Sequence, residues 1–189
     1  MKIYLLRHEK RSLLNPTFYS PLLKDGLEDA EKLKYLLDKE NINLIFSSPF
    51  KRVLQTIKPF CDMKKTNVNI EYSLYERIAC HSHHKIKFDK NNFHLKLLES
   101  DEEYYLINQE YESFLNLEDV KYGNDSKSRA LNFLNFVKEK YKGQDVNILF
   151  ATHAGLIDDI TEDGQPPMGS LTLHCENDKI LNVPLNYKV

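Results

Sequence analysis

The chain is 189 residues long and 41% of its residues are hydrophobic, which is enough for the core of one compact domain. Its formal net charge is -2 and charges of both signs are interspersed, so the composition argues against a nucleic-acid-binding or membrane-surface protein. Three widely separated cysteines without a CxxC pair indicate reduced thiols, and no apolar run reaches transmembrane or signal-peptide length, so we expect a single cytoplasmic domain spanning residues 1–189.

The N-terminal part alternates between short apolar runs and helical patterns. Strands are predicted at three short runs, 3–6, 43–47 and 68–72. Apolar residues recur at helical spacing over about 27–40 and about 50–61, and Pro49 suits the first turn of the second helix. This order of strand, helix, strand, helix, strand is typical of a largely parallel sheet covered by helices.

The C-terminal part begins with a weaker pattern. One or two helices are expected across Phe93–Leu117, followed by an amphipathic helix at 126–141 and a buried strand at 146–151. Two short runs, 171–173 and 180–183, resemble a closing hairpin. We therefore expect an α/β fold, a three-layer sandwich in which helices flank a mostly parallel central sheet.

Polar residues stand where two of the predicted strands end. Arg7 and His8 follow the first strand, and His153 follows the strand at 146–151. The carboxyl ends of parallel strands share one edge of the sheet, where ligands bind in such folds. Arg52 lies on the helix that Ser47-Ser48-Pro49 opens, and both arginines and helix N-termini favour phosphate. Two arginines, two histidines and a nearby carboxylate are the groups that phosphoryl transfer through a histidine requires.

These residues belong to motifs through which the chain resembles the histidine phosphatase (phosphoglycerate mutase-like) superfamily. The most specific motif is Ser-Ser-Pro-x-x-Arg-x-x-Gln-Thr, because its matches stand at fixed spacing. The matching segments are Arg7-His8, Leu22-Leu23-Lys24-Asp25-Gly26, Ser47-Ser48-Pro49 with Arg52 and Gln55-Thr56, Leu74-Tyr75-Glu76, and Thr152-His153-Ala154-Gly155. The resemblance covers nearly the whole chain except 85–121.

The resemblance implies a reaction and a role for each matching residue. His8 would be the nucleophile that becomes a phosphohistidine, and Glu76 would be the proton donor. Arg7, Arg52 and His153 would form the phosphate pocket. His8 has to be neutral to attack, whereas His153 serves better as a cation or hydrogen-bond donor, and such opposed demands are how acid and base roles are assigned.

Two further residues are candidates for substrate binding. Asn15 is an offset match to the family's asparagine, and Arg77 follows Glu76 as an arginine often does in the mutase branch. Neither a metal nor an organic cofactor is expected, because the arginines supply the electrostatic stabilisation. His81, His83 and His84 lack the carboxylate or cysteine that would complete a known metal spacing, so we interpret them as part of a solvated or substrate-facing loop.

The chain departs from the family pattern next to both histidines. Glu9 replaces a glycine after His8 and would repel phosphate unless it turns away or pairs with Lys10 or Arg11, and Ala154 replaces the first glycine after His153. The helix that follows His153 is expected to be short, because acidic residues accumulate at 158–163 in what we interpret as a solvated loop.

The favoured hypothesis is a phosphoric-ester hydrolase acting on a phosphomonoester, with a small-molecule phosphate ester or a phosphoprotein as substrate. A mutase-type phosphotransferase is the enzymatic alternative, although it needs lids and insertions to shield the phosphohistidine. A phosphate-binding module without turnover is the alternative from another class, motivated by Glu9 and Ala154. The specificity segment is expected at about 77–121, and neither substrate identity nor oligomeric state follows from the sequence.

Overall fold

The computed structural model describes residues 1–12, 18–77, 95–121, 125–174 and 180–183. Its strands form one six-stranded sheet in the order β3-β2-β4-β1-β5-β6. The strands are β1 (Lys2–Arg7), β2 (Leu44–Ser47), β3 (Asn69–Ile70), β4 (Asn147–Thr152), β5 (Leu171–His174) and β6 (Ile180–Val183). The pairings among β3, β2, β4 and β1 are parallel, and β5 and β6 are added as antiparallel strands. The predicted mostly parallel sheet and its closing hairpin are confirmed.

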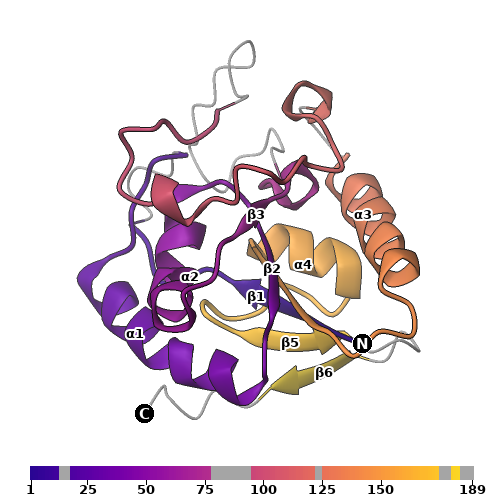
Figure 1. The fold of residues 1–189 in the computed structure, drawn as a ribbon, viewed down its shortest axis with the longest axis horizontal. Helices are drawn as coiled ribbons and strands as arrows, with labels where there is room; N and C mark the ends of the chain where they lie inside the picture. Colours follow the sequence, from indigo (N-terminus) through magenta and orange to yellow (C-terminus); the bar gives the residue numbers. More distant parts are fainter. Residues whose placement is uncertain (13–17, 78–94, 122–124, 175–179, 184–189) are drawn as a thin grey trace.

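Helices cover both faces of this sheet (Figure 1). They are α1 (Lys24–Lys39), α2 (Lys51–Lys64), α3 (Ser126–Lys140) and α4 (Ala154–Thr161). In Figure 1 the pair α1 and α2 lies on the left and the pair α3 and α4 on the right. Each was predicted from helical periodicity or, for α4, as a short helix after His153. The interpretation of 158–163 as a solvated loop is wrong for residues 158–161, because α4 continues to Thr161.

Alternation along β1 explains the two layers of core. Tyr4 and Leu6 point into the hydrophobic cluster that α1 and α2 cover, and Ile3 and Leu5 point into the cluster beneath α3 and α4. Successive side chains of a strand face opposite sides of the sheet, so a central strand with helices on both faces is apolar throughout.

The prediction of one or two helices across Phe93–Leu117 is wrong for the described part of that range. From 95 onwards it contains the 3-10 turn Tyr104–Leu106, an isolated parallel bridge of Ile107 to Val68 and otherwise irregular chain, with another 3-10 turn at Leu117–Asp119. The buried carboxylate of Glu71 accepts hydrogen bonds from the backbone N–H groups of Phe114 (2.9 Å) and Leu115 (3.4 Å). Tertiary hydrogen bonds thus satisfy backbone groups that a helix would have paired internally.

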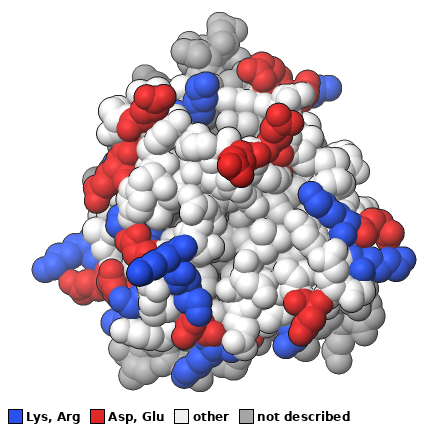
Figure 2. Space-filling model, viewed as in Figure 1, with Lys and Arg blue, Asp and Glu red and all other residues white. Residues whose placement is uncertain are grey.

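The surface agrees with the mixed charge of the sequence. Figure 2 shows basic and acidic side chains interspersed around the rim of one face, with a broad area free of charged side chains at its middle. Among the described residues, no helix is both long and apolar enough to cross a membrane.

Candidate functional site

The site lies where β1, β2 and β4 end at one edge of the sheet. Arg7 pairs with Thr152 across β1 and β4, and Ser47 pairs with Ala151 across β2 and β4. The backbone N–H of His8 donates to the carbonyl of Thr152 at 3.1 Å. This register brings the residues that follow the three strands together, as expected from the sequence.

The His8 ring is held by its own neighbour in the chain. Its Nδ1 lies 2.7 Å from the backbone carbonyl oxygen of Glu9. A carbonyl only accepts hydrogen bonds, so Nδ1 carries the proton and Nε2 keeps its lone pair. His8 is buried, and burial together with Arg52 and His153 lowers its pKa well below the ordinary value. The imidazole is therefore neutral at pH 7, with Nε2 available as a nucleophile.

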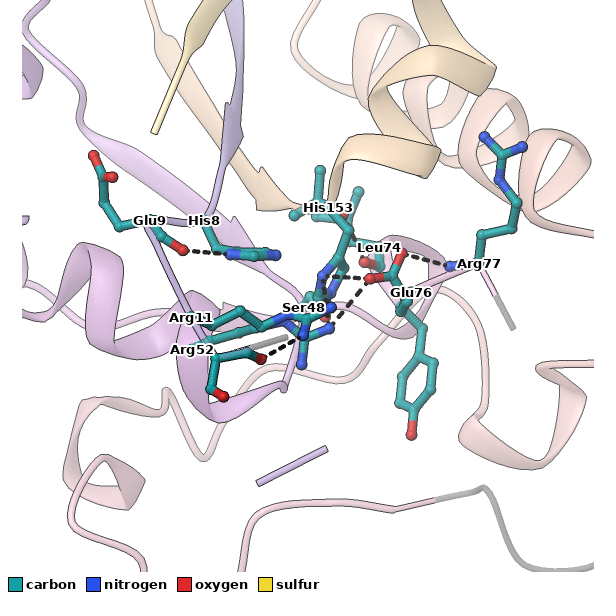
Figure 3. A network of polar contacts seen from close by, with 12 residues as sticks. His8, Glu9, Arg11, Ser48, Arg52, Leu74, Glu76, Arg77 and His153 are labelled. Atoms are coloured by element: carbon teal, nitrogen blue, oxygen red, sulfur yellow. Dashed lines mark hydrogen bonds and ion pairs between the residues drawn. The ribbon is translucent and has the colours of Figure 1, made fainter. Parts of the chain in front are cut away.

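Glu76, Arg52 and His153 form a compact triangle (Figure 3). Glu76 Oε2 lies 3.1 Å from His153 Nδ1 and 3.2 Å from Arg52 Nη2. Arg52 Nη2 and His153 Nδ1 are 3.3 Å apart. The His8 and His153 ring centroids are separated by 5.4 Å, so the triangle adjoins the predicted nucleophile.

Charge and burial fix the protonation of this triangle. Burial alone would raise the pKa of Glu76, but His153 and Arg52 hold it well below the ordinary carboxyl value. Burial lowers the pKa of His153 to about 4, and burial lowers that of Arg52 to about 10. At pH 7 Glu76 is a carboxylate, Arg52 a cation and His153 neutral, so His153 acts here as a hydrogen-bond donor rather than as a cation.

The start of α2 orients the triangle. Ser48 Oγ lies 2.9 Å from His153 Nε2, and because Nδ1 donates to the Glu76 carboxylate, Nε2 accepts from the hydroxyl. Phe50, the residue before α2, places its ring 4.5 Å from the Arg52 guanidinium carbon and 4.8 Å from the His153 ring centroid. The apolar ring excludes water from one side of both groups.

Arg11 belongs to the same cluster, although it was not predicted. Its side chain is buried, and its charge interacts with Glu76, Arg52 and His153. Figure 3 shows it directed towards the same cluster as Arg52. A basic residue in the mixed stretch Lys10–Ser12 carries no periodic signal, so only the fold distinguishes Arg11 from its neighbour Lys10.

The other predicted site residues have different surroundings. Arg7 donates from Nη1 to the Pro166 carbonyl at 2.5 Å, and its charge still interacts with that of Glu76. Arg77 turns away from the triangle (Figure 3) and donates to the Gly155 carbonyl at 2.5 Å. It also pairs with Asp158 at 3.4 Å and Asp159 at 3.3 Å, so the structure does not bring Arg77 into the cluster. Asn15 and the histidines at 81, 83 and 84 lie outside the described residues.

Glu9 does not face the cluster. Its carboxyl group is buried and points away from His8 and Arg52 (Figure 3). It lies against Gly169, where an added Cβ would overlap it and where the backbone φ of +66° already favours glycine. The Glu9 carboxylate is therefore turned away from the place where a phosphate at His8 would lie, and Glu9 contributes its backbone carbonyl to the site instead.

The cluster as a whole is strongly cationic. The charges of Arg7, Arg11 and Arg52 all interact with Glu76, which is the carboxylate that the triangle contains. Three guanidinium groups around one carboxylate leave an excess of positive charge that suits a phosphate dianion. Within the described residues, no group of three histidine, cysteine, aspartate or glutamate side chains is placed to hold a metal ion.

The fold and this cluster define an α/β protein with a cationic arginine–histidine cluster at the carboxyl edge of its sheet. The sequence matches the histidine phosphatase superfamily (branch 1) over residues 3–180, and the chain belongs to this superfamily.

Solved structures with similar folds include the ecdysone phosphate phosphatase of Bombix mori in complex with tungstate. That match has a TM-score of 0.64 and 14% identity, and covers 97% of this chain and 92% of the other. Phosphoglycerate mutase from Thermus thermophilus matches with a TM-score of 0.60 at 18% identity, covering 98% of this chain and 100% of the other. YhfR of Bacillus stearothermophilus matches with a TM-score of 0.62 at 18% identity, covering 96% and 94%. No curated protein sequence matches.

Proposed function

We propose that the chain is a phosphomonoesterase that acts through a phosphohistidine formed on His8. The observation that supports this most directly is the Nδ1 hydrogen bond of His8 to the Glu9 carbonyl at 2.7 Å. It leaves Nε2 unprotonated on a buried, neutral ring beside the cationic cluster. A neutral imidazole with a fixed tautomer next to guanidinium groups is what attack on a bound phosphoryl group requires.

The proposed reaction has two steps that reuse the same groups. His8 Nε2 bonds to phosphorus while the bond from phosphorus to the ester oxygen breaks, and the leaving oxygen takes a proton from Glu76. A water molecule then gives a proton to the Glu76 carboxylate and attacks phosphorus, which releases inorganic phosphate and restores neutral His8. Arg52 and Arg11 hold the non-bridging oxygens throughout.

Glu76 starts this cycle in the wrong protonation state. Its carboxylate makes the contacts with Arg52 and His153 that a phosphoryl oxygen would use. A bound phosphate dianion takes over these contacts, which are the charge of Arg52 and the N–H of neutral His153, and a carboxylate left beside a dianion takes up a proton. Substrate binding therefore supplies the acid that the first step consumes.

The test is to trap the intermediate. Wild-type protein is mixed with para-nitrophenyl phosphate, quenched in alkali and digested, and the phosphopeptide is located by mass spectrometry. We expect an acid-labile, alkali-stable phosphate on His8, with label and turnover both absent in His8→Ala. Asp38→Asn serves as the control, because Asp38 pairs with Lys64 on the exposed side of α1 and α2.

The remaining outcomes separate the alternatives. A labelled His8 that passes its phosphate to an added alcohol faster than to water would identify a mutase-type phosphotransferase. Binding of inorganic phosphate or tungstate without any label, across a panel of phosphorylated metabolites and phosphopeptides, would identify a binding module. Substantial turnover by His8→Ala would exclude the proposed mechanism.

A further inference from the structure

Arg129, on α3, reaches across to the segment that carries Glu76. It is buried, and its guanidinium donates from Nη1 to the carbonyls of Ser73 (2.8 Å) and Tyr75 (2.7 Å). From Nη2 it donates to the carbonyl of Glu76 itself at 3.0 Å. One side chain therefore binds three of the four carbonyl groups from Ser73 to Glu76, more than 50 residues away in sequence.

The remaining carbonyl of this segment has a donor from the sheet. The hydroxyl of Thr152, the last residue of β4, donates to the carbonyl of Leu74 at 2.8 Å. Ser73 and Leu74 are the last two residues of the 3-10 turn Tyr72–Leu74, and within the described residues the segment joins neither a helix nor a strand beyond that turn. Its backbone position therefore depends on side-chain donors, because the backbone bonds of that turn run to the carbonyls of Glu71 and Tyr72, whereas the carbonyls from Ser73 to Glu76 accept from side chains.

Because Arg129 is buried, its guanidinium has to find hydrogen-bond acceptors inside the protein. Removing a guanidinium from water is costly unless its donors are satisfied. Its carboxylate partner, Asp125, lies 3.5 Å from Nε at the start of the same helix. The two terminal nitrogens are thus occupied by carbonyls, and the planar fork of an arginine can bind several carbonyls at once where a lysine binds as a single point.

We infer that Arg129 is a positioning residue that sets where Glu76 stands against Arg52 and His153. The inference rests on the proposed function only for the catalytic role of Glu76, since the placement of its carboxylate can be measured without turnover. Arg129 holds the backbone of Glu76 and leaves its side chain able to change partners when phosphate binds.

The experiment compares Arg129→Met and Arg129→Lys with Val137→Ala. Val137 is a buried residue of the same helix in the core beneath α3, so its truncation weakens the packing of α3 through a side chain that is not a donor to the Glu76 segment. Two readouts are used in the full-length protein. One is the ratio of kcat/KM for an alkyl phosphate to that for para-nitrophenyl phosphate, and the other is the carboxyl carbon NMR titration of Glu76, assigned with Glu76→Gln.

A nitrophenolate leaves without a proton donor, whereas an alkoxide requires one. We expect Arg129→Met to lower the alkyl-to-nitrophenyl ratio at least about tenfold, within the range that general acid catalysis supplies. It should also move the titration of Glu76 towards that of an ordinary carboxyl group. Arg129→Lys should recover only part of both effects, and Val137→Ala should change neither.

An unchanged ratio and an unchanged Glu76 titration in both arginine variants would overturn the inference. An equal shift in Val137→Ala would do so too, because a general loosening of α3 would then be the cause. If Arg129→Met does not fold, Arg129→Lys carries the same comparison. If the wild-type protein hydrolyses no ester, the proposed function fails, and the Glu76 titration still decides the role of Arg129.

Discussion

Glu76 and phosphate should compete for the same contacts, which makes Glu76→Gln an informative perturbation. The ion pair between Arg52 Nη2 and Glu76 Oε2 spans 3.2 Å, and the Glu76 side chain is 16% exposed. At an effective dielectric constant of about 20, the attraction across this distance is roughly 5 kcal/mol before desolvation is counted. Removing one partner of a buried pair costs about 3–5 kcal/mol. Because the glutamine oxygen still accepts from Arg52, we expect the low end, about 3 kcal/mol of lost unfolding free energy.

The same substitution should strengthen phosphate binding. The variant has no carboxylate to displace, so inorganic phosphate should bind it at least about tenfold more tightly, which corresponds to about 1.4 kcal/mol. Phosphate at about a hundred times its dissociation constant stabilises a protein by about 2.7 kcal/mol, so it should return most of the stability that Glu76→Gln loses. Wild-type protein should show a smaller gain at the same phosphate concentration.

The assays are urea denaturation with and without phosphate, and calorimetric titration with phosphate in two buffers of different ionisation enthalpy. Wild-type protein should take up a proton on binding phosphate, because Glu76 exchanges cationic neighbours for an anion. Glu76→Gln should not. Asp38→Asn, which breaks a partly exposed pair with Lys64, should change stability by less than about 1 kcal/mol and leave phosphate binding unaltered. Weaker phosphate binding by Glu76→Gln, or full stability without phosphate, would refute the competition.

Three further predictions concern the surroundings of the cluster. Gly155→Ala should lower the unfolding free energy, measured by urea denaturation, by about 1–3 kcal/mol, because its Cβ would lie 2.9 Å from Arg77 Nε. In a chain that also carries Arg77→Ala, Gly155→Ala should change the unfolding free energy very little. Between about pH 6.5 and pH 4 the unfolded state binds protons that His153 in the folded state does not, since its pKa there is about 4, so unfolding free energy should fall by about 3 kcal/mol as pH decreases through that window. The lowered pKa of His8 adds to this loss of unfolding free energy. His153→Asn should therefore remove only the part of the pH dependence that His153 contributes. An unchanged dependence of unfolding free energy on pH in that variant would show that His153 is charged in the folded state. Glu9→Gly should leave the salt dependence of kcat/KM unchanged because its carboxyl group points away from the cluster; a marked change would show that its charge reaches the substrate.

Much of the fold was predictable because its signals are local. The apolar run of β1 and the helical spacing in α1 report burial directly, and the alternation of strands and helices indicates parallel crossovers. The meeting of His8, Arg52 and His153 was predictable for a related reason, since strand ends share an edge. The failure at Phe93–Leu117 shows the limit, because the backbone N–H groups of Phe114 and Leu115 donate to the distant carboxylate of Glu71 instead of to carbonyls within a helix.

The direction of a side chain is what the sequence could not supply. Arg77 follows Glu76 directly, yet the two side chains diverge, and Arg77 binds α4 instead. Glu9 follows His8 and turns its carboxylate towards Gly169. Arg11 and Arg129 carry no motif signal of their own, and each is recognisable only once the fold has buried it beside a specific partner.

In the proposed mechanism, the competition at Glu76 links the stability of the protein to its chemistry. A cluster of three arginines without an anion would repel itself, and a carboxylate fixed there permanently would exclude phosphate. A carboxylate that leaves when phosphate arrives satisfies both demands, provided that only its side chain moves. Arg129 and Thr152 hold the backbone of this segment through its carbonyl groups, which leaves the χ angles of the Glu76 side chain free to change. The irregular segment at Glu76 is therefore consistent with a group that has to occupy two positions in each catalytic cycle.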